Sequence, residues 1–390
     1  MQSYTGNLLL GTTLVLATTG GFAAWIARST FYRALLSREA SSARFHAIDG
    51  LRGYLAVGVL MHHLSINQQL YRTGVWQLTP SRIDTFLGRG SVAFFFMITA
   101  FLFWGRVLDC NSTFESVKFF TSRLRRLVPM YVTSASLVIL TALALTHFRI
   151  LVPAHDLTRQ VVSWLLFTIP GAPEINSFGQ STLINTVYWS LTYEWKFYLL
   201  LPLFAALARG WAFVVAAGVA LWITLFSTAQ VEWFFLSGCI AAYAVRIQAL
   251  RDAAQRAIGT PAALVSTVAA VLLQPMTYTP IGALLLFVPF VVLAAGNSFY
   301  GLLTFPAARV LGTLSYSFYL LHNWVLYLVS RLVNHFTPVS DLSAAQYWCV
   351  GCLAALITVG LSAFTFRFVE YPWIARLGKA RNGYHVEAVQ

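Results

Sequence analysis

The amino-acid sequence predicts an all-α fold, a polytopic bundle of transmembrane helices. Of its 390 residues, 58% are hydrophobic and 10% are charged, and the mean hydropathy is +0.68, a balance that soluble globular domains do not have. Apolar stretches near the length of about 20 residues that crosses a bilayer recur along the whole chain. Basic residues gather in alternate loops, as they do in membrane proteins. These three observations define the fold class.

Eleven apolar stretches are predicted to form the spanning helices. In chain order they are residues 8–27, 50–66, 91–108, 127–146, 188–208, 211–228, 232–246, 261–275, 280–296, 310–333 and 346–368. The apolar segment 164–170 is too short to cross a bilayer, so it is predicted to be interfacial or re-entrant.

The basic residues set the expected topology. With the N-terminus outside, 19 Lys and Arg residues fall in one set of loops and 6 in the other, while Lys196 remains within a span. The positive-inside rule then places the C-terminus in the cytoplasm and makes 148–187 the longest external loop. The excess of 26 basic over 13 acidic residues is therefore attributed to topology, and no nucleic-acid partner is expected.

Three regions are expected along the chain: an additional helix with a basic cytoplasmic linker (1–45), a membrane core (46–375) and a short cytoplasmic tail (376–390). Residues 8–27 could instead be a signal peptide, but residues 1–7 contain no positive charge and the basic residues follow the apolar run. That order favours a helix with its N-terminus outside.

The cysteines are interpreted as packing residues, and no metal site is predicted. A zinc site or a disulfide would need a second ligand pair or an exposed loop. The four positions are scattered: Cys110, Cys239, Cys349 and Cys352.

Ionisable side chains within the spans are costly in lipid, so each is a functional candidate. They are Arg52, His62, His63, Glu194, Lys196 and His322. On a helix, His63 lies close to three turns after Arg52 and shares its face, whereas His62 is rotated roughly 80° away. A rise of about 16 Å puts Arg52 at the cytoplasmic edge and His63 in the outer half of the span. Asp49, three residues before Arg52, can form an ion pair with it.

These residues also have simpler interpretations. Arg52 could serve as a topological anchor, and His63 could form an ordinary interhelical hydrogen bond. By depth in their spans, Glu194 and His322 could both meet His63, and a carboxylate partner would make the histidine a general base. The alternative is a proton relay or a packing cluster. Lys196, two residues after Glu194, points elsewhere and is assigned no chemistry.

The basic run 123–129 opens a predicted helix at its cytoplasmic end. Its arginines could bind the phosphates of a nucleotide cofactor. Contact with lipid headgroups or a topological role is equally compatible with the run, and the residues alone favour these alternatives.

Six runs, taken in order, resemble membrane-bound acyltransferase family 3, whose members are integral membrane O-acyltransferases acting on carbohydrates. The runs are 48–53 with His63 further on, the Phe-rich span 94–103, the basic run 123–129, Trp189-Ser190-Leu191 followed by Glu194, the run 315–322 that ends on His322, and 368–372. They cover nearly the whole chain. One departure is Thr99-Ala100-Phe101, where the family commonly has Ser-Gly-Phe, but small residues remain for close helix packing.

The resemblance implies a ten-helix core, to which 8–27 adds one helix, and an acyl-CoA co-substrate, most often acetyl-CoA, bound from the cytoplasm. It implies a carbohydrate or lipid-linked glycan acceptor at the external face of a bacterial cytoplasmic membrane. Many relatives carry a fused esterase-like domain, which is not expected here. The catalytic candidates carried over are His63, Arg52, Glu194 and His322, and the donor-binding candidates are Arg52, Arg123 and Arg126.

A proton-coupled transporter of an anionic solute is the competing class. It would show duplicated halves with paired broken helices, which the sequence lacks, and a non-catalytic scaffold would leave the polar residues unexplained. For the enzyme, segments 67–90 and 148–187 are expected to shape the acceptor site. Tyr71, Trp76 and Trp164 are candidate sugar-stacking surfaces, or else part of an interfacial aromatic belt.

Overall fold

The computed structural model describes residues 2–40, 45–109, 115–274 and 276–375. Cys110 and the tail predicted at 376–390 lie outside these residues. Within them the chain forms helices and no β-strand, only an isolated bridge between Ile175 and Phe178. The all-α prediction is confirmed.

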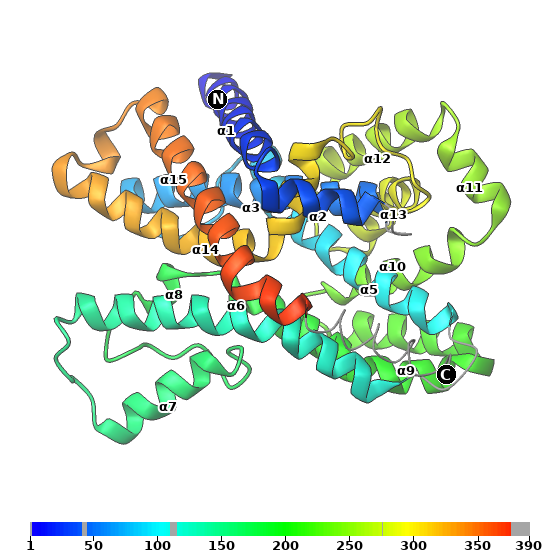
Figure 1. Cartoon of the computed structure of the whole chain (residues 1–390), viewed down its shortest axis with the longest axis horizontal. Coiled ribbons are helices and arrows are strands. Elements are labelled where there is room, and N and C mark those ends of the chain that lie inside the picture. Colours follow the sequence, from blue (N-terminus) through cyan, green and yellow to red (C-terminus); the bar gives the residue numbers. More distant parts are fainter. Residues whose placement is uncertain (1, 41–44, 110–114, 275, 376–390) are drawn as a thin grey trace.

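Figure 1 shows the helices as a bundle in which α6, α7 and α9 occupy one half and α10 to α13 gather at one end of the other half. The elements are α1 (Gln2–Ala27), α2 (Thr30–Ala40), α3 (His46–Thr73), α4 (Arg82–Thr85), the π-helical turn η1 (Phe86–Gly90), α5 (Ser91–Asp109), α6 (Ser116–Leu145), α7 (Ala154–Leu165), α8 (Ser181–Ile184), α9 (Tyr188–Phe226), α10 (Glu232–Ala244), α11 (Gln248–Gln255), α12 (Gly259–Leu273), α13 (Pro280–Ala294), α14 (Pro306–Phe336), the 3₁₀ turn η2 (Val339–Asp341), α15 (Ala344–Thr365) and the π-helical turn η3 (Phe366–Glu370).

Each of the eleven predicted stretches coincides with a helix. The label α9 covers two of them, 188–208 and 211–228, which are separate helices as predicted and meet at a break where Trp211 has non-helical dihedral angles (φ −128°, ψ 22°). The residues that precede α9 and those that follow it, among them Thr186 and Thr228, line the same cavity, so the chain turns back at this break. The segment 164–170 is not an element of its own, because it begins in the last turn of α7 and continues as turns.

The centre of the bundle is the crossing of α3 and α14. The Cβ that Gly312 lacks would lie 1.8 Å from the carbonyl oxygen of Asp49, and one on Gly53 would lie 2.6 Å from Cβ of Leu311. Side chains at these positions would separate the two backbones, so glycine is what permits the close approach. The polar residues of both helices are thereby brought into one interior.

The Gly312→Ala variant is expected to be less stable than the wild type by about 1–3 kcal/mol, the usual cost of overpacking. The added methyl group would collide with the Asp49 carbonyl group, which belongs to a helix and cannot retreat. Thermal unfolding of the detergent-solubilised protein, followed by tryptophan fluorescence, measures the effect. Gly218→Ala is the matched control, since nothing lies within 4 Å of its Cβ position. Equal melting temperatures for both variants would contradict this account of the crossing.

The same close packing occurs between α5 and α10. A Cβ on Gly238 would lie 2.3 Å from the carbonyl oxygen of Met97 and 2.8 Å from Cβ of Ala100. Ala100 is fully buried. The small residue at this position, where the sequence departs from the family pattern, therefore retains the packing that was expected of it.

The outer surface is apolar, as a protein in lipid requires. Within the described residues, four segments are long and apolar enough to cross a bilayer, namely 10–27, 82–109, 116–145 and 344–375, and α10 with α11, which meet at 102°, would make a fifth. Large hydrophobic side chains are exposed along α9 and α12, including Leu199, Leu203, Phe213, Leu221, Val265 and Leu273. A soluble protein does not expose such a surface. The chain is a multi-pass membrane protein, and the number and direction of its crossings remain predictions.

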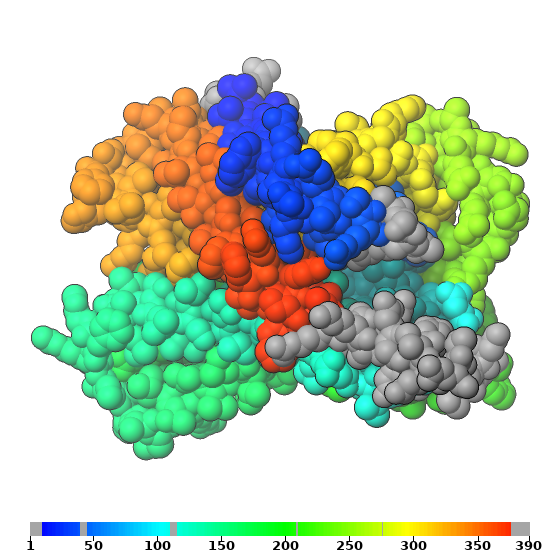
Figure 2. All heavy atoms as spheres, in the orientation of Figure 1, coloured from blue at the N-terminus to red at the C-terminus, as the bar shows by residue number. Residues whose placement is uncertain are grey.

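The N-terminal helix α1 is packed into this bundle. It lies along α14 and α15, and a Cβ on Gly11 would overlap the indole of Trp348. In α2, the Tyr32 hydroxyl donates to the carbonyl oxygen of Ala363 at 2.7 Å. Figure 2 shows both helices, in blue, on the outside of this face beside α15.

The cysteines within the described residues have free thiols. These are Cys239, Cys349 and Cys352. Cys352 accepts a hydrogen bond from the Thr18 hydroxyl at 3.7 Å, so it takes part in the contact between α1 and α15.

Candidate active site

Two cavities lie inside the bundle, and α3 contributes to both. Arg52 lines the first, of about 600 Å³, which we call the arginine cavity. His63 lines the second, of about 640 Å³, which we call the histidine cavity. Val92 and Tyr319 line both cavities. The shared helical face predicted for Arg52 and His63 thus leads from one cavity to the next.

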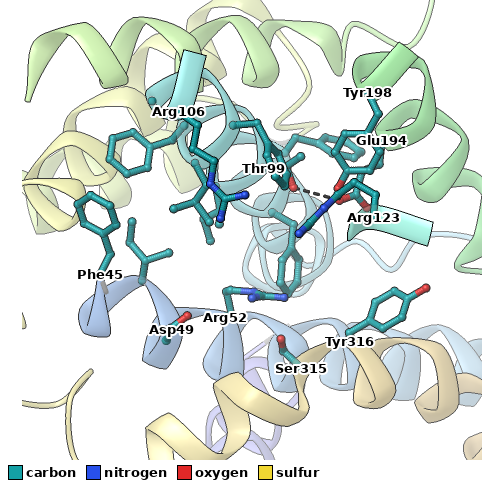
Figure 3. Close-up of a pocket in the computed structure, with 18 of the residues that line it drawn as sticks. Phe45, Asp49, Arg52, Thr99, Arg106, Arg123, Glu194, Tyr198, Ser315 and Tyr316 are labelled. Atoms are coloured by element: carbon teal, nitrogen blue, oxygen red, sulfur yellow. Dashed lines mark hydrogen bonds between the residues drawn. The ribbon is translucent and has the colours of Figure 1, made fainter. Parts of the chain in front are cut away.

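The arginine cavity is strongly basic. Six arginines line it against three carboxylates: Arg52, Arg106, Arg123, Arg126, Arg246 and Arg251 against Asp49, Asp109 and Glu194. Figure 3 shows Arg52 of α3, Arg106 of α5 and Arg123 of α6 turned toward the same space. The Arg123 guanidinium lies over the Phe103 ring, 4.6 Å from its centroid. Convergent guanidinium groups of this kind suit phosphate groups.

Two buried polar atoms of this cavity have no hydrogen-bond partner in the described structure. They are Nε of Arg123 and Oγ of Ser315, and the Ser315 side chain is 1% exposed. Buried polar atoms are nearly always paired in folded proteins. A polar ligand in the cavity would supply the missing partners.

Glu194 faces the arginine cavity. Its Oε1 accepts hydrogen bonds from the Thr99 hydroxyl at 3.2 Å and from the Tyr198 hydroxyl, and the first of these is drawn in Figure 3. The expectation that Glu194 meets His63 is therefore wrong. Similar depth does not bring the two together, because Glu194 points from α9 toward α5 rather than toward α3.

His322 does meet His63. Nδ1 of His63 lies 2.8 Å from Nε2 of His322, and Nδ1 of His322 lies 3.2 Å from the carbonyl oxygen of Phe318. A carbonyl oxygen only accepts, so Nδ1 of His322 carries the proton and Nε2 of the neutral ring is an acceptor. His63 then donates through its own Nδ1, so its Nε2 carries a lone pair and is an acceptor. That is the tautomer a general base requires.

The acceptor nitrogen of His63 lies at the histidine cavity. The hydroxyl of Thr186, which also lines the cavity, donates to this Nε2 over a long distance of 3.5 Å, and the Trp76 ring lies 5.9 Å from the His63 ring between centroids. His322 is fully buried behind it, with the two imidazoles stacked at 5.0 Å. His63 can therefore contact a substrate in the cavity, whereas His322 acts by holding His63.

His62 lines the same cavity, which the helical phase did not predict. Its ring centroid lies 5.6 Å from that of His63. Its Nδ1, however, points to Asp84, 2.9 Å from the carbonyl oxygen and 3.5 Å from the carboxylate, and Thr79 donates to that carboxylate at 2.6 Å. His62 therefore bonds to Asp84 of α4, whereas His63 bonds to His322 of α14, so the two histidines differ in their partners and not in the cavity that they line.

The turn of α14 that precedes His322 is fixed by a buried polar cluster. Ser134 and Asn185 both donate to the carbonyl oxygen of Leu320, at 2.9 and 2.8 Å, and the Tyr188 hydroxyl lies 2.7 Å from Oγ of Ser134. These contacts set the position of His322 and through it that of His63. Sequence reasoning missed this cluster, because single Ser, Asn and Tyr residues give no distinctive signal.

Of the three candidate aromatic surfaces, one lies at the site. Trp76 lines the histidine cavity. Trp164 is 1% exposed and its indole donates to the carbonyl oxygen of Pro173 at 2.8 Å, so it is a core residue and the prediction is wrong. Tyr71 is not among the lining residues of either cavity.

The remaining predicted residues differ in whether they line a cavity. Lys196 lies over the Tyr193 ring at 4.7 Å and is not among the lining residues of either cavity. Arg52, Arg123 and Arg126 come together in the arginine cavity, as expected. The residues that sequence reasoning passed over are Ser315 and Tyr319, although both belong to the run 315–322, and Arg106, Arg246 and Arg251, which had been counted only for topology.

The chain is thus a membrane-embedded bundle with a basic cavity beside a cavity that holds an oriented histidine. The family model described as an acyltransferase domain matches residues 45–367. The chain belongs to this family, acyltransferase family 3, as the resemblance indicated.

Two curated relatives are similar to the chain. The peptidoglycan O-acetyltransferase OatA of Listeria monocytogenes is 24% identical over 375 residues, covering 84% of this chain and 55% of the relative. The exopolysaccharide production protein ExoZ of Rhizobium meliloti is 29% identical over 135 residues, covering 35% of this chain and 40% of the relative. The chain thus spans about half the length of the curated relatives it matches. No solved structure matches it.

Proposed function

We propose that this protein is an O-acetyltransferase that moves an acetyl group from cytoplasmic acetyl-CoA to a hydroxyl of a carbohydrate or glycolipid acceptor at the external face. The observation that supports this most directly is the pair of cavities that meet at Val92 and Tyr319, one basic and the other holding His63. The arginine cavity receives the donor and the histidine cavity the acceptor.

The distribution of lining residues supports the two assignments. The arginines of the first cavity all come from the loops and helix ends that the charge pattern places in the cytoplasm. The second cavity is lined by Trp76, Thr186, Thr228 and Met276, from segments that the same pattern places outside. A carbohydrate acceptor agrees with the names of the relatives, which refer to peptidoglycan and to exopolysaccharide.

The chemistry follows from the orientation of His63. Its Nε2 accepts the proton of the acceptor hydroxyl while the hydroxyl oxygen forms a bond to the thioester carbonyl carbon. The C–S bond then breaks, and the thiolate of CoA takes up the proton from Nε2. During the step, the hydrogen bond from Nδ1 to His322 holds the ring, and the arginines hold the donor by its phosphates.

The direct test uses membranes that contain the full chain, incubated with acetyl-labelled acetyl-CoA and the glycans of the host. Labelled O-acetyl ester in the glycan fraction, removed by mild alkali and absent from membranes without the protein, is the expected result. A proton-coupled transporter or a scaffold would leave the donor unconsumed. Absence of labelled ester with protein present in the membrane would overturn the proposal.

Replacing Arg123 or Arg126 by glutamine is expected to raise the KM for acetyl-CoA roughly 10- to 100-fold, because a hydrogen bond to a charged group contributes about 1.5–3 kcal/mol. Steady-state kinetics with varied acetyl-CoA measure the change. Arg125→Gln is the matched control on the same helix, since Arg125 is not among the described lining residues. Equal KM values for all three variants would show that the donor does not bind in the arginine cavity.

A further inference from the structure

The histidine cavity has one formally charged side chain among its described lining residues, that of Arg89. Arg89 belongs to the π-helical turn η1. A Cβ on Gly88 would lie 2.1 Å from Cδ2 of His62, and one on Gly90 would lie 2.9 Å from the Phe86 ring. The turn is therefore fitted closely around His62, and π-turns occur frequently at functional sites. This local geometry places an arginine in the wall of the cavity that contains His63.

The Arg89 guanidinium is held in place, but not all of its N–H donors have an acceptor among the described residues. Its Nη1 donates to the carbonyl oxygen of Met276 at 3.1 Å, and the group lies over the Tyr278 ring at 5.3 Å. No described residue accepts a hydrogen bond from Nε or Nη2. Two contacts thus fix the plane of the group, while several of its five N–H donors remain available to a ligand.

No described carboxylate lines this cavity to neutralise Arg89. Asp84, behind His62, is fully buried and bonded to Thr79. Glu232 accepts a hydrogen bond from the Ser227 hydroxyl at 2.7 Å. Asp84 bonds through Oδ2 only, and its Oδ1 has no hydrogen-bond partner in the described structure. No described ion pair joins either carboxylate to Arg89, so the positive charge of Arg89 is available to a substrate.

We infer that the acceptor is an anionic glycan, and that Arg89 binds a carboxylate or phosphate group on the sugar that is acetylated or on its neighbour. This inference rests on the proposed function. A planar guanidinium with free donors matches these groups in shape and charge. Trp76, Trp189, Tyr193 and Tyr278 also line the cavity, so the sugar ring has apolar and aromatic walls while its acidic group meets Arg89.

The test compares the charge of the acetylated product with the effect of Arg89 variants. Membranes with the full chain are incubated with labelled acetyl-CoA, and the labelled glycan is cut to small fragments, separated by anion exchange and identified by mass. We expect the label in fragments that contain a uronate, another carboxylate or a phosphate. Label confined to neutral fragments would overturn the inference but not the proposed function, whereas no label in any fragment would overturn the proposed function itself.

The Arg89→Gln variant is expected to raise the KM for the acceptor glycan, identified from the labelled fragments, at least about 10-fold. The KM for acetyl-CoA should be unchanged. Arg89→Lys should recover part of the loss because it keeps the charge. Arg82→Gln is the matched control, since Arg82 is exposed, donates to the carbonyl oxygen of Leu272 and does not line the cavity. Each variant is assayed in vesicles of phosphatidylcholine alone and with added phosphatidylglycerol. A defect that appears only with the anionic lipid would assign Arg89 to a lipid headgroup and would refute the inference, as would wild-type KM values for Arg89→Gln.

Discussion

The His63→Ala variant is expected to lose acetyl transfer by a factor of about 10² to 10⁴, the usual contribution of a general base. In the structure, Nδ1 of His63 donates to His322, and its Nε2 is an acceptor at the histidine cavity, with only the long contact to the Thr186 hydroxyl among the described residues. Alanine removes that nitrogen and leaves no other described side chain in its place. The rate of labelled ester formation, divided by the amount of protein in the membrane, measures the loss.

The control for this variant is His62→Ala. His62 lines the same cavity, but its Nδ1 bonds to Asp84 and cannot face the acceptor hydroxyl, so its replacement should reduce the rate much less. Donor binding should be unchanged in both variants, because neither histidine lines the arginine cavity. Wild-type ester formation by His63→Ala would remove His63 from the mechanism.

The Val92→Trp variant is expected to lower acetyl transfer at least about 100-fold, a loss of about 2.7 kcal/mol in transition-state stabilisation. Val92 lines both cavities and its side chain is 6% exposed. An indole at this position would fill the junction through which the thioester must meet the acceptor. The substitution leaves the arginines of the arginine cavity in place, so under the proposed function the affinity for CoA should change little.

Two measurements separate a blocked junction from a misfolded protein. Calorimetric titration of the detergent-solubilised variant with CoA should give a Kd near that of the wild type, and Val92→Ala, which widens the junction, should retain transfer. If Val92→Trp binds CoA normally and also transfers acetyl groups at the wild-type rate, the acetyl group does not pass between the two cavities at Val92.

The sequence predicted the positions of the helices well, but it predicted only some of the side-chain contacts between them. Apolar runs and helical spacing depend on residues that are close in the chain, and they correctly located all the expected helical segments and the common face of Arg52 and His63. Depth in a span was a weaker guide. It paired His63 with His322 correctly but also with Glu194, which bonds instead to Thr99 and Tyr198, because depth says nothing of the rotation of a helix about its axis.

Some arginines of the site were missed because they had been used only to assign the membrane topology. Arg89 and Arg106 had been assigned to topology alone, yet each lines a cavity. A positive residue at a helix end satisfies the positive-inside rule whether it faces solvent, lipid or a ligand. Only its surroundings in three dimensions tell these cases apart. The same holds for Trp164, which the sequence left as either a sugar-stacking surface or part of an interfacial belt and which the structure buries.

By itself, the sequence determined that the chain is a helical membrane protein, that α3 presents an arginine and a histidine on one face, and that its motifs resemble one acyltransferase family. The tertiary structure decided that this face opens into two cavities, that His322 orients His63, and that Glu194 belongs to the arginine cavity. The physical reason lies in the crossing of α3 and α14 at Gly53 and Gly312. Close backbone packing there fixes the separation and rotation of the two helices, which no local pattern in the chain specifies.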